Sequence, residues 1–312
     1  MGRLYNSGMI SVIIPMFNTG KECKRLVSGI LTKKPQSFED NKQELEVICV
    51  DDASTDDSYD TLWKSFAQDE RFTLLRQSKN SGAAAARNRA LEVARGDLIV
   101  FLDSDDDIRA DFLQKMTAAM KDENIALAVC GIRQKYLHLR KTVDKFTKAP
   151  VSREANETLK HYALRTMVKD AHLYSSVNKI YRGEIIRKNS LRFREELDFA
   201  EDTTFVLDYL ADCDTDDEII FITEPLYVYN YGTDTSVVSE SSLEWRNWQR
   251  NFDDIKAWAD ADSQNDLRKL YQRFKISHAL AVARSPKPWR SKIQYLNPIA
   301  LFFASLVVKI RS

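Results

Sequence analysis

Cysteine is scarce in this chain, and its distribution argues against a zinc site. The four cysteines, Cys23, Cys49, Cys130 and Cys213, lie far apart among 312 residues, without a Cys-x-x-Cys pair or a neighbouring histidine. Zinc sites need such ligands at short, regular spacing, so zinc is not an expected ligand. Cys49 and Cys130 lie inside apolar runs, as small core residues do. Unpaired cysteines are typical of a reducing compartment, and we expect a cytoplasmic protein.

Long hydrophobic runs are absent as well. Residues 1–9 form an N-terminal extension without the apolar core of a secretory signal, and Asn6 breaks the myristoylation pattern, so neither signal is expected. The apolar run from Ile299 to Val308 has ten residues, whereas a membrane-spanning helix needs about 20. A run of this length suits a helix in the membrane interface, or one that packs on the protein itself or on a partner subunit.

The chain has no excess charge of either sign, with 46 basic and 46 acidic side chains. Nucleic-acid-binding proteins normally carry a strongly basic surface, so nucleic acid is not an expected partner. The balance conceals an asymmetry, because no acidic residue follows Asp266 while ten basic residues do. An uncompensated positive segment favours an anionic surface as its partner. We therefore expect residues 268–312 to contact the inner face of the plasma membrane peripherally.

Short apolar runs alternate with helical stretches in the N-terminal part of the chain. The runs have strand length and many β-branched residues, and this alternation predicts an α/β fold with a mostly parallel sheet flanked by helices. Ligands of such sheets bind at the carboxyl ends of the strands. The expected strands cover 10–15, 45–52, 72–77, 97–103 and 125–131, and the expected helices cover 20–32, 56–69, 82–95 and 109–122.

The pattern is less regular after residue 132. The basic segment 134–148 suits a hairpin or a mobile loop. We divide the chain into a ligand-binding half (10–132), a second half of the same domain (133–235) and a helical C-terminal region (236–312). Within the second half, helices are expected at 155–168, 182–189 and 201–211, and short strands at 218–223 and 225–231.

Four carboxylates follow one apolar strand within five positions, in the stretch DLIVFLDSDDD (97–107). Like charges this close repel, so each must be solvated or neutralised. Asp103 and Asp105 lie two positions apart after a strand, where both side chains project to the same side and can share one ligand. Carboxylates suit Mg²⁺ or Mn²⁺, which also bind substrate phosphates. Asp106 and Asp107 are instead expected to cap a helix that follows directly.

A second acidic stretch, VDDASTDDS, follows an earlier strand. Residues 54–56 are typical helix caps, whereas Asp52, at the strand end, is a candidate acceptor for a nucleobase imide N–H. The alanine-rich stretch NSGAAAARNRA (80–90) predicts a helix that packs closely on the sheet, since alanine is the best helix former. On this helix we expect Arg87 to face a base or a phosphate.

The stretches SVIIPMFN, VDDASTDDS, NSGAAAARN and FLDSDDD, in this order and spacing, resemble the family 2 glycosyltransferases of the GT-A fold. The resemblance covers about residues 10–130, and the ordered combination of motifs is highly specific. It implies a GT-A, Rossmann-like domain with a helical C-terminal extension. It also implies a nucleotide-diphosphate-sugar donor, with a UDP-sugar expected. The residues that it places at the donor are Pro15, Phe17, Asn18, Asp52, Gly82, Arg87, Asp103, Ser104 and Asp105.

The resemblance also implies individual roles. Pro15, Phe17 and Asp52 match base-binding positions, and Phe17 stands where relatives more often have a tyrosine. Asp103 matches a position that contacts the ribose. Asp105 matches the ligand of a Mn²⁺ or Mg²⁺ cofactor that bridges to the diphosphate.

A general base that deprotonates the acceptor hydroxyl is expected in DFAEDTTFVLDYL (198–210). From the sequence alone, Glu201 and Asp202 fit a capping cluster at the start of an amphipathic helix. The resemblance instead makes Asp202 the base and Glu201 a contact of the acceptor.

Two local matches are less specific. SSVNKIYRGEII resembles a stretch that precedes the acceptor site, with Asn178 and Lys179 near the donor, although Lys179 equally suits the surface. In YVYNYGTDTSVV, Asn230 stands where many relatives have an arginine, and Tyr231 or Ser236 are the candidates to replace its phosphate contact.

The resulting hypothesis is an inverting, metal-dependent transfer of a hexose-type sugar from a UDP-sugar to a hydroxyl. The acceptor would be a glycan or a lipid-linked oligosaccharide in surface polysaccharide synthesis. One alternative is a sugar nucleotidyltransferase, which needs a glycine-rich phosphate loop where this chain has PMFNTGKECKR with a single glycine. The other alternative is a non-catalytic, membrane-recruited module that binds a nucleotide-sugar.

Overall fold

The structure is a computed structural model that describes most of the chain up to Tyr231. The helical region predicted at 236–312, including the basic tail and Ser236, lies outside the described residues. Among the residues that are described, no helix is both long and apolar enough to cross a bilayer. The described residues are 8–32, 44–137, 139–147, 152–154, 157–167, 171–197 and 201–231.

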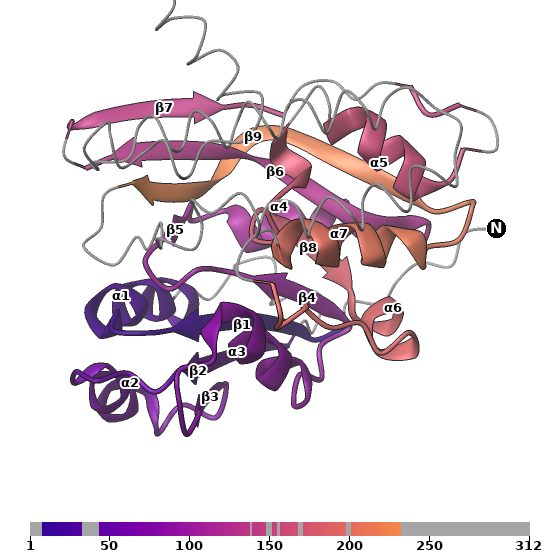
Figure 1. Cartoon of the computed structure of the whole chain (residues 1–312). Helices are drawn as coiled ribbons and strands as arrows, with labels where there is room; N and C mark the ends of the chain where they lie inside the picture. Colours follow the sequence, from indigo (N-terminus) through magenta and orange to yellow (C-terminus); the bar gives the residue numbers. More distant parts are fainter. Residues whose placement is uncertain are drawn as a thin grey trace, which may run out of the picture.

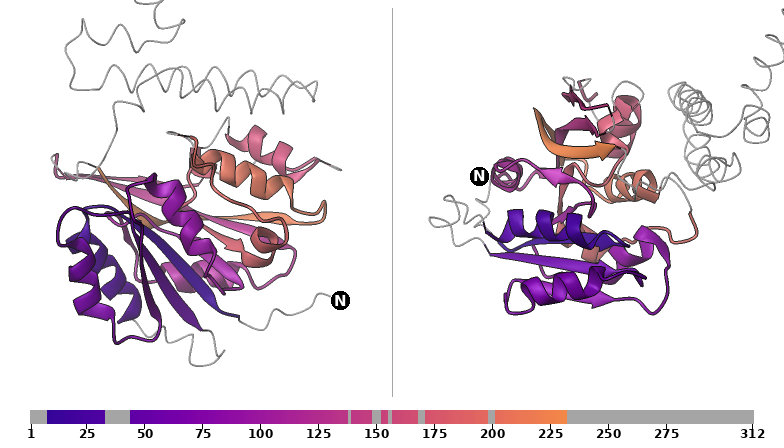
Figure 2. Two further views of the ribbon diagram at one scale, coloured as in Figure 1. Left: turned by 60° about the horizontal axis from the view of Figure 1, so that its bottom comes forward. Right: turned by 90° about the vertical axis from the view of Figure 1, so that its left-hand side faces the viewer.

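The first four long strands form a parallel half-sheet (Figures 1 and 2). β1 (Ile10–Met16) pairs in parallel with β2 (Leu45–Asp51) on one side and with β4 (Leu98–Phe101) on the other. β2 in turn pairs in parallel with β3 (Phe72–Arg76). These are the strands that the apolar runs predict, and all seven residues of β1 are buried because helices cover both faces.

The sheet continues as a mixed second half. Its order is β3-β2-β1-β4-β8-β6-β9-β5, with β7 paired to β6. β8 is antiparallel to β4 and β6, whereas β6 and β9 are parallel. The predicted hairpin is therefore β6 with β7, and the two short strands expected after 218 are one strand, β9. The bounds are β5 (Asp107–Ile108), β6 (Ile125–Tyr136), β7 (Lys141–Lys145), β8 (Lys179–Arg182) and β9 (Glu218–Tyr231).

Helices pack on the two faces of this sheet and build two cores. α1, α2 and α4 contribute to one core, and α3, α5, α6 and α7 contribute to the other. The predicted helix starts at 56 and 109 are each early by two or three residues. The bounds are α1 (Gly20–Leu31), α2 (Ser58–Phe66), α3 (Gly82–Leu91), α4 (Phe112–Ala119), α5 (Leu159–Met167), α6 (Gly183–Lys188) and α7 (Glu201–Ala211), with a 3-10 turn at Ala171–Leu173.

An aromatic cluster fixes α7 against the centre of the sheet. Phe101 of β4 lies edge-on to Tyr181 of β8, to Phe193 and to Phe205 of α7, with ring centroids 5.0 to 5.6 Å apart. Aromatic pairs in this geometry contribute about 0.5–1.5 kcal/mol each beyond their burial. The cluster therefore sets the position of α7, and with it the position of the acidic pair at its first turn.

Candidate active site

A cavity of about 180 Å³ lies at the carboxyl ends of β1, β2 and β4. Three strand ends that are far apart in sequence supply its polar lining, and the start of α3 adds Ala83. The cavity thus brings together six of the nine residues predicted at the donor. Its lining is Pro15, Met16, Phe17, Thr19, Asp52, Ala83, Asp103, Ser104 and Asp105. Met16, Thr19 and Ala83 were not predicted at the donor, although Met16 lies within SVIIPMFN and Ala83 within NSGAAAARN.

The other three predicted donor residues support the cavity without lining it. Asn18 adopts a left-handed backbone (φ 53°), and its side-chain oxygen accepts the Thr55 N–H at 2.9 Å. Gly82 also has a positive φ of 88°, which glycine tolerates without strain. The hydrogen bond between Thr55 and Asn18 connects the loop after β2 to the loop after β1. The third residue, Arg87, points to a group of carboxylates described below.

Asp52 is buried and holds the start of α3. Its carboxylate accepts the backbone N–H groups of Ser81 (2.8 Å) and Gly82 (2.7 Å) and the side-chain amide of Gln77 (2.6 Å). Negative charge at a helix N-terminus is stabilised by the unpaired N–H groups there. A carboxylate offers about four acceptor positions, so three are used by the protein and one is available at the cavity that Asp52 lines.

The acidic loop 103–107 divides differently from the prediction. Asp106 is 2% exposed and accepts the Tyr227 hydroxyl at 2.5 Å and the Asn230 N–H at 2.8 Å. Burial, with the nearby charge of Asp103, raises the pKa of Asp106 well above its ordinary value. The prediction that Asp106 and Asp107 cap a helix is wrong, because Asp107 belongs to β5 and α4 begins only at Phe112.

Asn230 fastens the same loop to β9. Its side-chain amide donates to the backbone carbonyl of Asp105 at 2.9 Å and to the carboxylate of Asp107 at 3.2 Å. Asn230 thus holds the loop directly, while Tyr231 stacks on Tyr136. The bonds of Tyr227 and Asn230 to this loop could not be predicted from the sequence, because the partners lie more than 120 residues away.

Arg87 lies beneath three carboxylates. It is 3% exposed, and its guanidinium contacts Asp103 at 2.8 Å, Asp202 at 3.1 Å and Glu201 at 3.3 Å. Although burial lowers the pKa of Arg87, the attraction of the three carboxylates outweighs it and raises the pKa. The structure therefore directs Arg87 at these acids rather than at the cavity, where a base or phosphate contact was expected.

Hydrogen bonds from two serines hold Asp202 of the acidic pair of α7, in addition to its contact with Arg87. Asp202 accepts the Ser176 hydroxyl at 2.7 Å through Oδ1 and the Ser175 hydroxyl at 3.3 Å through Oδ2. Glu201 is its neighbour, and burial followed by repulsion from Asp202 raises the pKa of Glu201 to about 7. Burial also raises the pKa of Asp103, against the attraction of Arg87. The second half of the chain thus supplies a carboxylate pair beside the donor cavity.

Asn178 and Lys179 are structural residues in the described fold. The Asn178 amide donates to the backbone carbonyl of Cys130 at 2.6 Å. Lys179 is fully buried in β8, where its ammonium donates to the carbonyl of His172 at 2.6 Å and to that of Ser175. Lys179 is therefore not a surface charge, whereas its position near the donor stays a prediction. A lysine on a central strand was not foreseen because two of its partners are backbone carbonyls, which no sequence motif marks.

The described residues fit a cation that binds together with a diphosphate. No group of three or more His, Cys, Asp or Glu side chains among them is arranged to hold a metal ion. Asp103 is paired with Arg87, and Asp105 lines the cavity beside it. Mg²⁺ commonly binds through one or two carboxylates and completes its coordination with substrate phosphates and water. Asp105 suits that arrangement, and a resident metal held by protein groups alone does not fit.

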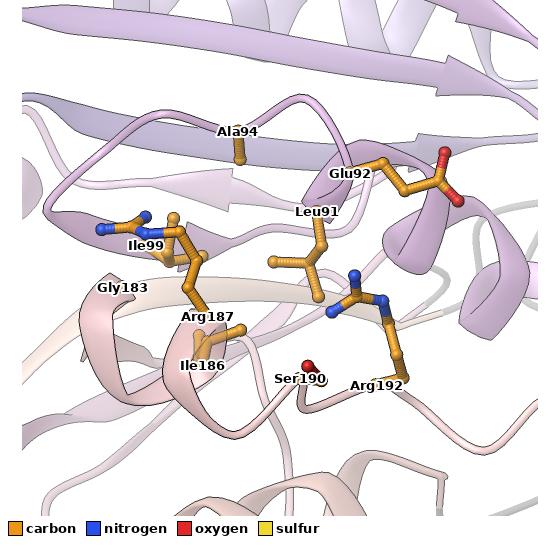
Figure 3. Close-up of a pocket in the computed structure, with 9 residues that line it drawn as sticks. All are labelled: Leu91, Glu92, Ala94, Ile99, Gly183, Ile186, Arg187, Ser190 and Arg192. Atoms are coloured by element: carbon orange, nitrogen blue, oxygen red, sulfur yellow. The ribbon is translucent and has the colours of Figure 1, made fainter.

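A second cavity, of about 220 Å³, lies away from these residues (Figure 3). It is formed where the end of α3 meets the start of β4 and the helix α6. Arg187 at its edge donates to the Gly96 carbonyl at 2.8 Å. None of the predicted site residues lines this cavity. Its lining is Leu91, Glu92, Ala94, Ile99, Gly183, Ile186, Arg187, Ser190 and Arg192.

Solved structures share this architecture. The chain matches Staphylococcus aureus TarS residues 1–349 in complex with UDP-GlcNAc with a TM-score of 0.56 and 21% identity, over 92% of this chain and 70% of that one. It matches the mannosyltransferase PcManGT from Pyrobaculum calidifontis, in complex with GDP-Man and Mn²⁺, with a TM-score of 0.56 and 16% identity, over 100% and 83%. The likeness establishes the GT-A fold.

Sequence comparison gives the family. A family model described as glycosyl transferase family 2 matches residues 11–189, more than half of the chain, and the chain belongs to this family. It is 27% identical over 225 residues to the uncharacterized glycosyltransferase EpsJ of Bacillus subtilis, spanning 71% of this chain and 60% of EpsJ. It is 31% identical over 198 residues to the poly(ribitol-phosphate) beta-N-acetylglucosaminyltransferase TarS of Staphylococcus aureus, spanning 63% of this chain and 31% of TarS.

Proposed function

We propose that the protein is an inverting glycosyltransferase that moves a hexose-type sugar from a UDP-sugar to an acceptor hydroxyl. One observation carries the proposal: Arg87 joins Asp103, which lines the donor cavity, to Asp202 at the start of α7. This contact supports the proposal, because a displacement at the anomeric carbon requires a donor site and a carboxylate able to take a proton side by side.

The nucleoside would occupy the end of the cavity nearest β1 and β2. Phe17 is 38% exposed, so its ring is accessible for stacking on a base. Pro15 lies beside it in the cavity wall, and the remaining acceptor position of Asp52 suits a nucleobase imide N–H. The likeness to TarS with bound UDP-GlcNAc supports a uridine nucleotide.

The ribose would contact Asp103, and the diphosphate would lie beside Ser104 and Asp105. Asp105 would hold the Mn²⁺ or Mg²⁺, which stabilises the charge of the departing nucleoside diphosphate when bound. The loop's own contribution is to present Asp105 in a fixed place, because Asn230 and the buried Asp106 fasten it to β9. The likeness to PcManGT with GDP-Man and Mn²⁺ supports a divalent cation.

Asp202 would take the proton from the acceptor hydroxyl. Its Oδ1 accepts bonds from Ser176 and Arg87, whereas Oδ2 accepts one longer bond, from Ser175. Oδ2 is therefore the oxygen that we assign to the proton. Glu201, one residue earlier, would contact the acceptor. Together these residues orient the hydroxyl opposite the leaving group, which gives inversion at the anomeric carbon.

The acceptor would be a glycan or a lipid-linked oligosaccharide of surface polysaccharide synthesis, reached at the inner face of the plasma membrane. The name of the TarS relative, a transferase that acts on poly(ribitol-phosphate), supports a surface polymer. The basic residues of segment 268–312 support a peripheral membrane contact. Comparing liposome binding by the full chain and by a chain shortened before residue 291 tests this part of the proposal.

A donor screen tests the proposed activity. Purified protein with Mn²⁺ is incubated with UDP- and GDP-sugars, and release of the nucleoside diphosphate is measured. We expect release from at least one UDP-sugar, and its loss when a chelator removes the cation. Binding of donors without any turnover, in the presence of membrane extract as acceptor source, would instead support a non-catalytic binding module.

A further inference from the structure

We propose that Arg87 is a positioning residue that fixes Asp202 relative to the donor loop. The inference rests on the proposed role of Asp202 as the base. It assigns to Arg87 a task that differs from direct contact with a base or phosphate of the donor. Its evidence is the burial of the guanidinium, its partners, and the packing that holds it.

Arg87 reaches the site only through other side chains. The guanidinium is 3% exposed, whereas the carboxylates of Asp103 and Asp202 above it are 31% and 21% exposed. It does not line the donor cavity. Its Nη2 contacts Asp103 and its Nη1 contacts Asp202, so one rigid group spans the two halves of the chain. A change in its position would therefore move the base relative to the donor.

The packing beneath Arg87 connects the same two elements. Its guanidinium carbon lies 5.1 Å from the centre of the Phe193 ring, and that ring stacks on Phe205 of α7 at 4.0 Å. The next residue of α3, Asn88, bonds both backbone groups of Phe193, each at 2.8 Å. Arg87 and Asn88 thus tie α3 to the segment under α7 and to the acidic pair at its start.

The charges explain why an arginine is needed. Three carboxylates converge on one cation, and without it they would repel each other and separate. A planar guanidinium donates in several fixed directions at once, whereas a lysine ammonium is a point charge on a flexible chain. Lysine at this position would keep the charge but not the spacing between Asp103 and Asp202. Misplacement of a reacting group by about 1 Å can cost about 100-fold in rate.

A double-mutant cycle between Arg87→Lys and Asp202→Asn tests the inference. In the wild-type background Arg87→Lys should lower kcat about 100-fold, while the donor KM and the affinity for UDP with Mn²⁺ change little. In the Asp202→Asn background the same substitution should cost less than about threefold, because the group that Arg87 positions is gone. Equal losses in both backgrounds, or a loss that appears in UDP affinity, would overturn the proposal.

Matched variants separate positioning from folding. Arg89→Lys changes an exposed arginine of the same helix, paired with Glu92, and should leave kcat unchanged. If circular dichroism shows Arg87→Lys to be unfolded, Arg87→Gln with Glu201→Gln removes one charge of each sign. Its kcat relative to that of Glu201→Gln alone, measured with Asp202 and again with Asp202→Asn, gives an equivalent cycle. If Asp202→Asn retains full transfer, the proposed function fails; if transfer is lost there but Arg87→Lys equals wild type, only this inference fails.

Discussion

The two halves of the molecule build their parts of the site by different means. In the parallel half, strand order alone brings Phe17, Asp52 and Asp103 to one sheet edge, at the ends of β1, β2 and β4. In the mixed half, Asp202 reaches the same place through side-chain contacts with Arg87 and Ser176. The shape of the donor cavity should therefore depend on the sheet itself, whereas the placement of the base should depend on single side chains such as Arg87 and Ser176.

The largest effect is expected for Asp105→Ala. Removal of the proposed cation ligand should reduce transfer about 1000-fold or more, because charge stabilisation of the leaving group is commonly worth this much. UDP binding should lose its dependence on Mn²⁺, since no other cluster of ligands among the described residues replaces Asp105. Isothermal titration with UDP, with and without Mn²⁺, measures the second effect. Undiminished Mn²⁺ dependence would place the cation elsewhere.

Ser176→Ala should lower kcat about tenfold, since a neutral hydrogen bond to a charged group is worth about 1.5–3 kcal/mol and only part of it orients the base. Donor affinity should not change, because Ser176 contacts Asp202 and not the cavity. Ser175→Ala is the matched control. Its hydroxyl lies 3.3 Å from Asp202 rather than 2.7 Å, so it should cost less. The reverse order would contradict the assignment of Ser176.

Tyr227→Phe should destabilise the protein by about 1–3 kcal/mol, because it removes a donor from the buried carboxylate of Asp106. Urea unfolding measures the change. Tyr136→Phe is a control, since the bond of its hydroxyl among the described residues lies within β6, to Gln134. An equally large loss of unfolding free energy in Tyr136→Phe would contradict a particular contribution of the Tyr227–Asp106 bond to stability. UDP affinity should fall in Tyr227→Phe alone, because the loop carries Asp103 and Asp105.

The smallest effect concerns pH and stability. The pKa of Glu201 rises from its ordinary value of 4.5 to about 7 in the fold, so the folded protein binds more protons than the unfolded chain in that window. Stability then falls as pH rises through the window. Glu201→Gln removes this dependence: its melting temperature should match wild type at about pH 5 and exceed it by a few degrees at about pH 8. An equal difference at both values would contradict the pKa shift.

The parallel half was predictable because its information is local. Each apolar run is followed within a few residues by the polar residues at the end of its strand. The strands β1 and β4 accordingly fall close to their predicted ranges. The sequence also indicated the acidic pair of α7, though not what holds it. Arg87 with Asp202, and Asp106 with Tyr227, are pairs more than 110 residues apart. Such contacts depend on packing across the sheet, and no spacing in the sequence encodes them.

Asp202→Asn tests the central claim most directly, because it removes the proposed base and leaves the residues of the donor cavity unchanged. The substitution keeps the size of the side chain and its capacity to accept from Ser176, while it removes the proton acceptor. UDP affinity in the presence of Mn²⁺ and nucleoside diphosphate release are measured on the same sample. We predict wild-type affinity and a loss of release of about 100-fold to 10,000-fold. Lost affinity, or undiminished release, would contradict the division of the site into a donor cavity and a separately positioned base.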